Sequence, residues 1–327
     1  GGTPSLFAPE AIAEILDGAA ARLQFAHACE ITLETNPGTV EHGRFDGYAR
    51  AGVNRISFGV QSFDDAMLRA LGRIHSSGEA ESAVKLAQDA GFDNVNLDLM
   101  YALPKQPLQG ALTDVEHAVA LAPAHISHYQ LTLEPNTAFA ANPPPLPDDD
   151  AAWTMQEACQ ARLSRAGYAQ YEVSAYARDG RRCAHNLNYW RFGDYLGIGA
   201  GAHGKITAGG RRPAGGGSAA ARNVHRRWKV KHPRAYLESA NTTKRIGGDE
   251  VVSPGQLPFE YMLNALRLVD GVPAGDFAER TGLSPDTIRT PLRDAIARGW
   301  LHDNQSSLRT TELGQRFLND VIELFMA

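Results

Sequence analysis

The sequence predicts an α/β protein, with a curved or barrel-like sheet of parallel strands followed by a small helical domain. Three observations lead to this prediction. Strand and helix patterns alternate through the first part of the chain, and the helical stretches are long enough to serve as crossovers between parallel strands. Each strand pattern alternates polar and apolar residues, whereas parallel strands covered on both faces usually form continuous apolar runs. Towards the C-terminus the pattern becomes mainly helical.

Size and composition are typical of a globular protein. The 327 residues suffice for one large domain and a small second one. The net charge is −5, so no overall positive charge attracts nucleic acid or an anionic membrane. No apolar run approaches the ~18 residues of a membrane span. Three widely spaced cysteines form neither a disulfide framework nor a CxxC metal site, which predicts a reducing, cytoplasmic location. They are Cys29, Cys159 and Cys183.

The chain opens with the turn "GGTP", formed by Gly1, Gly2, Thr3 and a proline. Glycine has no Cβ, so this turn lets the backbone approach a ligand closely, and proline is favoured where a helix begins. A second proline, Pro9, begins a pattern of apolar residues on one helical face. These residues are Ile12, Ile15, Leu16, Ala19 and Leu23.

Four strand patterns follow, separated by helix patterns near 64–71, 77–90 and 108–121. An antiparallel sheet with one solvated face is the alternative, but it needs hairpin-length connections that the sequence lacks. Because ordinary (β/α) barrels fill their interior with apolar side chains, polar residues facing inward predict a polar ligand. The residues expected on the polar faces are Thr32 and Glu34; Arg55, Ser57, Gly59 and Gln61; Asn96 and Asp98; and His128, Gln130 and Thr132.

The remaining chain is expected to hold a helix over 149–166, a strand over 168–177 and an aromatic, glycine-rich segment up to about residue 204. Residues 206–221 are rich in Gly, Ala and Ser, which predicts a mobile loop. Beyond residue 255, helices are expected near 256–269, 274–281, 284–298 and 311–325, with short strands at 300–303 and 307–310.

Candidate binding residues stand where the strands end. Ligands of parallel α/β sheets bind at the carboxyl ends of the strands. Glu34 and Asp98 are suited to an ammonium group or ribose hydroxyls, and Arg73 to a carboxylate. Each residue alone is equally consistent with a surface ion pair or a turn, but their occurrence at successive strand ends favours a binding site. The full set is Gly1, Gly2, Thr3, Glu34, Gln61, Arg73 and Asp98.

Six segments carry a family resemblance: "GGTPS", "ETNPGTV", "NRISFGVQSFDD", "LGRIH", "NLDLMYALP" and "HNLNYW…YLGIGAGAHG". They resemble the radical SAM proteins related to oxygen-independent coproporphyrinogen III oxidase (HemN), and especially their heme-chaperone branch, HemW. The resemblance runs from residue 1 to the C-terminus. It implies a partial (β/α)6 barrel, incomplete at its N-terminus, with a small winged-helix-like C-terminal domain. It also implies that six of the candidate residues, all except Gly1, bind S-adenosylmethionine; Gly1 is added as their neighbour in the turn.

The family's [4Fe-4S] cluster is held by a CxxxCxxC loop upstream of the GGTP strand, and this sequence contains no such motif. The three cysteines present are too far apart to replace it. We therefore expect a chain truncated at its N-terminus, with the cluster present in the full-length form only; a cluster-free relative is the alternative. The chain as given should hold no metal and should not cleave S-adenosylmethionine, because that chemistry belongs to the cofactor.

The segment "HNLNYW" resembles one that marks the HemW branch. It is consistent with a loop packed by its aromatic side chains, or with a loop that faces a porphyrin. In the second case His185 is a candidate axial ligand of heme iron, and Tyr189 and Trp190 stack on the macrocycle. His203 in "GAHG" is a further candidate. Weaker candidates are His75 and His128.

Charge is unevenly distributed towards the C-terminus. Residues 205–250 contain eleven Lys and Arg against three Asp and Glu, which is consistent with a solvated face or with a patch that meets heme propionates or an acidic partner. The segment from residue 254 resembles a winged helix, a fold often used on DNA. It has seven Arg, no Lys and ten Asp or Glu, whereas phosphate binding requires positive charge. We expect it to be a structural or partner-docking module.

These observations predict three parts: a barrel core with the HNLNYW segment (1–204), a basic, glycine-rich loop and linker (205–254), and the winged-helix-like domain (255–327). The expected function is a heme chaperone that binds heme, inserts it into apoproteins and has an S-adenosylmethionine pocket. Enzymatic activity is not favoured, and homodimerisation is compatible with the sequence. The alternatives are oxygen-independent coproporphyrinogen III oxidase and a nucleic-acid-binding regulator.

Overall fold

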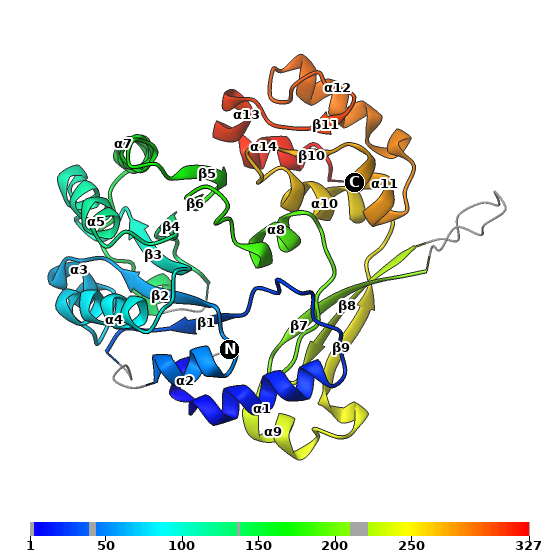
Figure 1. The fold of residues 1–327 in the computed structure, drawn as a ribbon. Coiled ribbons are helices and arrows are strands. Elements are labelled where there is room, and N and C mark those ends of the chain that lie inside the picture. The colour runs from blue at the N-terminus through cyan, green and yellow to red at the C-terminus, as the bar shows by residue number, and fades with distance from the viewer. Residues whose placement is uncertain (1–2, 39–43, 136–137, 210–221, 327) are drawn as a thin grey trace. The chain divides into compact units, whose positions relative to one another are not determined.

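The computed structural model describes residues 3–38, 44–135, 138–209 and 222–326. They divide into two compact units, the first reaching Cys183 and the second beginning at Ala184. Both are visible in Figure 1. The division into 1–204, 205–254 and 255–327 stays a prediction. Along the described residues, no helix combines the length and the apolar character needed to cross a membrane.

The first unit is built on a six-stranded sheet in the order β1-β2-β3-β4-β6-β5. The first four strands are parallel, and β6 pairs antiparallel with both β4 and β5. The single strand expected over 168–177 is therefore wrong, because the chain turns back on itself between β5 and β6. The strands are β1 (Thr32–Thr35), β2 (Arg55–Gln61), β3 (Val95–Tyr101), β4 (His125–Gln130), β5 (Ala169–Glu172) and β6 (Ala175–Ala177).

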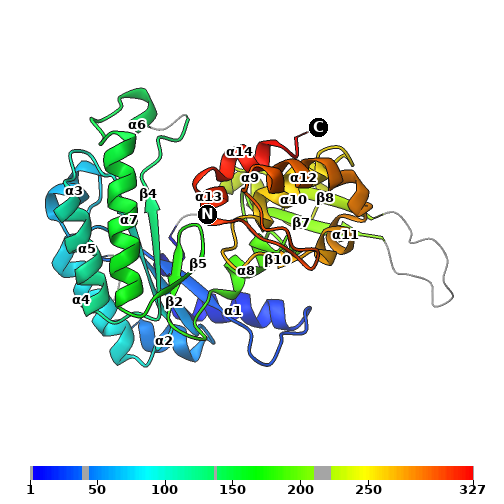
Figure 2. The same ribbon diagram turned by 90° about the horizontal axis from the view of Figure 1, so that it is seen from above.

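Helices α4, α5 and α7 cover one face of this sheet (Figure 2). Fully buried Phe58, Leu97 and Leu99 pack beneath them and form the main core. Side-chain caps fix several helix starts, including a capping box between Ser76 and Glu79 at α4. The helices are α1 (Pro9–Ala20), α2 (Phe45–Arg50), α3 (Asp65–Ala70), α4 (Ser77–Asp89), α5 (Leu108–Ala120), α6 (Ala138–Ala141) and α7 (Asp149–Arg165), with a 3-10 turn, η1 (Pro4–Leu6).

The second unit contains an antiparallel sheet in the order β7-β8-β9. The expected loop and linker over 205–254 does not describe its residues 205–208, 223–229 and 246–251, because these are paired in the strands. Residues 210–221, within the expected mobile loop, lie outside the described residues. The strands are β7 (His203–Ala208), β8 (Asn223–Lys229) and β9 (Ile246–Val251).

The helices of the second unit pack around a core that includes Phe192, Tyr261 and Phe277. The pair of strands expected at 300–303 and 307–310 is found only as a bridge between Leu301 and Thr310; β11 pairs instead with β10. The remaining elements are α8 (Ala184–Trp190), α9 (Pro233–Glu238), η2 (Thr243–Arg245), α10 (Leu257–Ala265), β10 (Val272–Pro273), α11 (Gly275–Thr281), η3 (Pro285–Ile288), α12 (Arg289–Ala297), β11 (Ser307–Leu308), α13 (Glu312–Arg316) and α14 (Leu318–Glu323).

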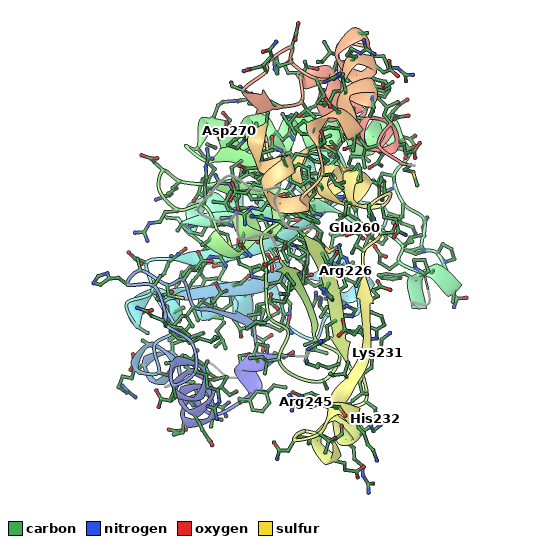
Figure 3. The ribbon with its side chains drawn as sticks, turned by 90° about the vertical axis from the view of Figure 1, so that its right-hand side faces the viewer. Arg226, Lys231, His232, Arg245, Glu260 and Asp270 are labelled. Atoms are coloured by element: carbon green, nitrogen blue, oxygen red, sulfur yellow. The ribbon has the colours of Figure 1, made fainter. Side chains whose placement is uncertain are left out.

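An ion pair connects the sheet of the second unit to its helices. Arg226 on β8 donates two hydrogen bonds to Glu260 on α10, at 2.6 and 3.1 Å, and Figure 3 shows the two side chains together. Both side chains are partly shielded from solvent. The pair therefore joins the strand to the core helix on the face opposite Arg227.

Candidate functional site

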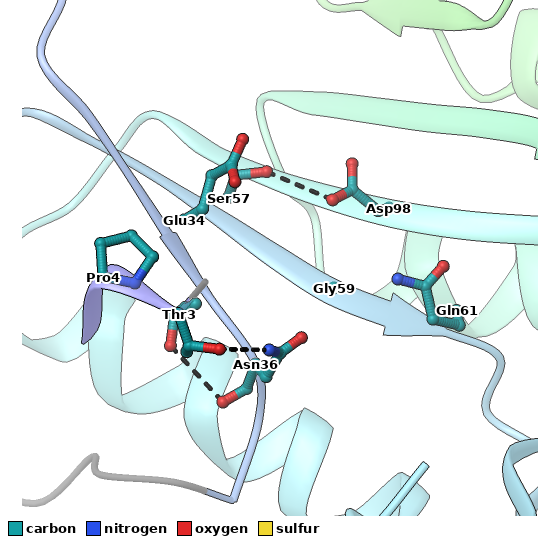
Figure 4. A pocket seen from close by; sticks show the side chains of 9 residues that line it. Thr3, Pro4, Glu34, Asn36, Ser57, Gly59, Gln61 and Asp98 are labelled. Atoms are coloured by element: carbon teal, nitrogen blue, oxygen red, sulfur yellow. Dashed lines mark hydrogen bonds between the residues drawn. The ribbon is translucent and has the colours of Figure 1, made fainter. Parts of the chain in front are cut away.

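A polar pocket lies at the carboxyl ends of the first strands (Figure 4), with a cavity volume of about 180 Å³. Four of the predicted residues meet there: Thr3, Glu34, Gln61 and Asp98. Gly1 and Gly2 lie outside the described residues. The rest of the lining consists of Pro4, Thr35, Asn36, Ser57 and Gly59. The structure thus brings together residues that are up to 95 positions apart in the sequence.

Asn36 connects the predicted residues on one side of the pocket. Its Nδ2 donates to Thr3 Oγ1 at 3.1 Å, as Figure 4 shows, and its Oδ1 accepts from Arg73 at 3.2 Å. Arg73 therefore adjoins the pocket through Asn36. Asn36 follows directly on β1, so its position at a strand end was the signal that could have identified it.

Gly59 keeps the floor of the pocket open. A Cβ at this position would lie 2.9 Å from Asn36 Oδ1 and 3.2 Å from Gln61 Nε2, so a side chain would fill the space a ligand needs. Gln61 has a left-handed φ of 70° at a register shift between β2 and β3. Tyr129 donates to Gln61 Oε1 at 2.8 Å, which fixes the orientation of the amide.

Two carboxylates give the pocket a negative character. Burial raises the pKa of Asp98, and the nearby carboxylate of Glu34 raises it further, while hydrogen bonds from Asn96 and Ser127 lower it. Ser57 also donates to Asp98, at 3.4 Å. A cationic group bound here would stabilise the ionised form of Asp98. The pocket is therefore suited to a ligand that carries positive charge together with polar groups.

The strand register corrects one prediction on the polar face. Asn96 is paired with His125 and Asp98 with Ser127, so His125, Ser127 and Tyr129 share the polar face. His128, expected there together with Gln130 and Thr132, instead stacks on Tyr101 with 4.7 Å between ring centroids. Both alternate sets of this strand contain histidine and other polar residues, so the sequence pattern could not distinguish them.

A buried hydrogen-bond chain leads from this face into the unit. Tyr171 is bonded to His125 Nε2 at 2.8 Å, and His125 Nδ1 to Asn96 Oδ1 at 2.5 Å. Asn96 Nδ2 donates to both Ser57 and Asp98 at 2.8 Å. Burial lowers the pKa of His125 to about 3, so the ring is neutral. Nδ1 is then the donor to Asn96, and Nε2 accepts from Tyr171. His125 therefore orients the amide that supports Asp98.

The described residues do not fit an iron–sulfur cluster. Cys159 and Cys183 are buried and Cys29 is half-buried, and none of the three forms a disulfide in the described residues. Burial raises the pKa of Cys159 to about 12, which disfavours the thiolate that a cluster requires. In the part of the chain that the structure describes, no three His, Cys, Asp or Glu side chains gather in a metal-binding arrangement.

The HNLNYW segment forms helix α8, so its interpretation as a loop is wrong. Asn188 stabilises the turn after the helix by donating to the Asp194 carbonyl at 3.1 Å. Trp190 packs against Arg267, whose guanidinium carbon lies 5.2 Å from the ring centroid. His185 and Tyr189 are exposed one helical turn apart. The contacts of Trp190 thus stabilise a helix that the local sequence pattern does not predict.

The other candidate heme ligands are not gathered on α8. His203 begins β7 and stacks on Trp228, with ring centroids 6.1 Å apart. His75 and His128 are buried in the first unit. His75 Nε2 lies 3.1 Å from the Val60 carbonyl, and burial lowers the pKa of His128 to about 4. These contacts assign structural roles to the two weaker candidates.

The comparisons assign this parallel sheet, with the polar pocket at its carboxyl edge, to the radical SAM proteins. A family model described as "Radical SAM superfamily" matches residues 1–118, and one described as "HemN C-terminal domain" matches residues 252–317. A solved structure of coproporphyrinogen III oxidase HemN from Escherichia coli superimposes with a TM-score of 0.78 over 99% of this chain and 76% of that chain, at 19% identity. This similarity confirms the predicted fold class.

Sequence comparison specifies the family. The chain is 49% identical over 327 residues to heme chaperone HemW of Escherichia coli, spanning all of this chain and 82% of that protein. It is 48% identical to heme chaperone HemW of Haemophilus influenzae (100% and 81% covered), and 32% identical to that of Bacillus subtilis (100% and 84%). The chain belongs to the HemW family of heme chaperones.

Proposed function

We propose that this protein is a heme chaperone: it binds heme as cargo and passes it to heme-accepting apoproteins. The observation that carries this proposal is the 49% identity to a heme chaperone over the whole chain. The oxidase alternative is supported by the fold alone, at 19% identity. The acidic balance beyond residue 254 argues against the nucleic-acid alternative.

The polar pocket is proposed to hold S-adenosylmethionine, which brings a sulfonium, an ammonium, a carboxylate and ribose hydroxyls. Glu34 and Asp98 would attract the cationic groups, and the open floor at Gly59 supports this assignment. Arg73 donates to Asn36, and together these two side chains would face the carboxylate of the ligand. The same role is proposed for Gly1, Gly2, Thr3 and Gln61. Binding here would serve regulation or dimerisation.

Heme contact is proposed for α8 and its surroundings. Exposed His185 would approach the iron, and Tyr189 and Trp190 would contact the macrocycle. His203 remains the second candidate. A cytoplasmic location and homodimer formation are part of the same proposal, and cysteines that form no disulfide among the described residues are compatible with a reducing compartment.

The test is a haemin titration of the purified chain followed at the Soret band. We expect a saturable band near one equivalent, weakened by His185→Ala and unchanged by the control His27→Ala, an exposed histidine of the first unit. No specific band would reject the heme proposal. S-adenosylmethionine binding is measured in parallel by calorimetry. We expect Asp98→Asn to bind it more weakly than the wild-type chain does; equal affinity would reject the pocket assignment.

A further inference from the structure

The second unit has a groove on one face of its sheet, with a cavity volume of about 320 Å³. This volume lies within the roughly 300–1,000 Å³ typical of small-molecule sites. Three adjacent pieces of chain form it, and all belong to the same unit. The lining residues are Tyr195, Leu196 and Gly197; Gly204, Ile206 and Ala208 on β7; and His225, Arg227 and Lys229 on β8.

The β7 side of the groove and the adjoining segment are lined mainly by glycine and apolar residues. The register pairs Gly204 with Arg227 and Ile206 with His225, so these residues share one face of the sheet. A Cβ on Gly204 would lie 3.0 Å from the Gly197 backbone nitrogen, so glycine allows the edge segment to pass close to β7. Ile206 is 39% exposed and Leu196 60%. A ligand with an apolar face would cover both.

Cationic side chains follow one another along β8 on the same face. Asp249 pairs with Arg227 and lies 3.9 Å from His225 Nδ1. Lys229 has a different environment: its pKa is lowered by partial desolvation and then by the positive charges of Arg245 and Arg227, against a smaller attraction from Asp249. This end of the groove therefore has an excess of positive charge that an anionic group would balance.

Further cations extend this positive region. Lys231 lies beyond the end of β8 and Arg245 directly before the start of β9 (Figure 3). At the other side of the groove, Tyr189 of the HNLNYW helix packs on the lining residue Tyr195, with 5.4 Å between ring centroids. The groove thus runs from the heme-candidate helix towards a cationic end.

We propose that this groove binds a carboxylated tetrapyrrole, with the flat ring on Ile206 and Leu196 and the carboxylates at Arg227 and Lys229. The choice of heme as the natural tetrapyrrole rests on the function proposed above. An apolar side with cations at one end matches a macrocycle that has apolar faces and acidic substituents along one edge. A groove covers one face of such a ring and leaves the other accessible, as transfer to an acceptor requires.

The experiment uses the whole chain and iron-free protoporphyrin IX, so that iron ligation does not contribute. Binding is followed by porphyrin fluorescence. The combined variant Arg227→Gln, Lys229→Gln should weaken binding about tenfold, as expected for two solvent-accessible charge contacts. Ile206→Asp, which places a carboxylate on the apolar side of the groove, should weaken it at least as much. Raised salt should weaken wild-type binding more than that of the double variant.

The matched control is Arg289→Gln with Lys85→Gln, which removes the same charge from residues whose side chains are 67% and 62% exposed and which do not line the groove. Equal weakening by this control would overturn the proposal, because the effect would then reflect total charge. Unchanged porphyrin binding in both groove variants would also overturn it; if haemin still bound, the heme-chaperone proposal would stand. Failure of the wild-type chain to bind either compound would overturn both. Thermal melting verifies that each variant is folded.

Discussion

Replacement of His125 by phenylalanine should destabilise the first unit and lower the affinity of its pocket for S-adenosylmethionine. The ring is fully buried and bonded to Asn96 and to Tyr171. Phenylalanine retains most of the volume, so the main loss is the two hydrogen bonds, each of which leaves a buried polar partner. A buried polar group left without its partner costs about 1–3 kcal/mol. Ser127 still donates to Asn96 at 3.2 Å, so we expect the free energy of unfolding to fall by about 2–4 kcal/mol in total.

The chain provides a matched control on the same strand. His128 is also buried, but its Nδ1 has no hydrogen-bond partner among the described residues, and it stacks on Tyr101. His128→Phe should therefore change the free energy of unfolding by less than about 1 kcal/mol. Both variants are compared by urea denaturation followed by circular dichroism.

The same pair of variants separates pocket support from general stability. His125→Phe removes the shorter of the two hydrogen bonds to Asn96 Oδ1 and leaves only that of Ser127. The affinity for S-adenosylmethionine should therefore fall about tenfold, as measured by calorimetry at a temperature where the variant is folded. His128→Phe should bind as wild type does. Equal stability of the two variants, or unchanged affinity in His125→Phe, would refute the role assigned to the hydrogen-bond chain.

Three further predictions concern other parts of the molecule. Gly59→Ala should lower S-adenosylmethionine affinity about tenfold or more with little change in melting temperature, since its Cβ enters the pocket; unchanged affinity would contradict this. Burial raises the pKa of Asp114 to about 6, so the folded state binds this proton more tightly than the unfolded state does. The resulting stabilisation is fully present below pH ~4 and is lost as the pH rises through ~6, so the free energy of unfolding should fall by about 3 kcal/mol over this range. Asp114→Asn should remove most of this pH dependence, as measured by urea denaturation. Glu260→Gln should cost the second unit about 1 kcal/mol by breaking its pair with Arg226, checked by thermal melting against Glu238→Gln, which removes an exposed pair.

The sequence pattern predicted the parallel part of the sheet and one side of the pocket well. On β1, β2 and β3 the polar and apolar residues alternate clearly, and the polar set includes Glu34 and Gln61 near the ends of their strands and Asp98 in the middle of β3, which all line the pocket. Parallel strands place their carboxyl ends at one edge. That general rule was enough to predict that these residues meet.

Elsewhere local pattern was insufficient because long-range contacts decided the structure. On β4 the register with β3 determined that His125 faces Asn96. The HNLNYW segment is helical, and its Trp190 packs against the core of the second unit, to which the segment belongs. The basic segment beyond residue 205 forms strands because each pairs with another strand, and an antiparallel sheet can have one solvated, charged face.

By itself, therefore, the sequence determined the family, the order of most elements of the first unit and the polar residues at its strand ends, since these depend on short motifs and on side-chain periodicity. The tertiary structure alone decided which face of β4 supports Asp98, that Gly59 opens the floor of the pocket, and that Ile206, Arg227 and Lys229 share one groove. Each of these depends on the register between strands, and register is set by packing and pairing across the whole sheet.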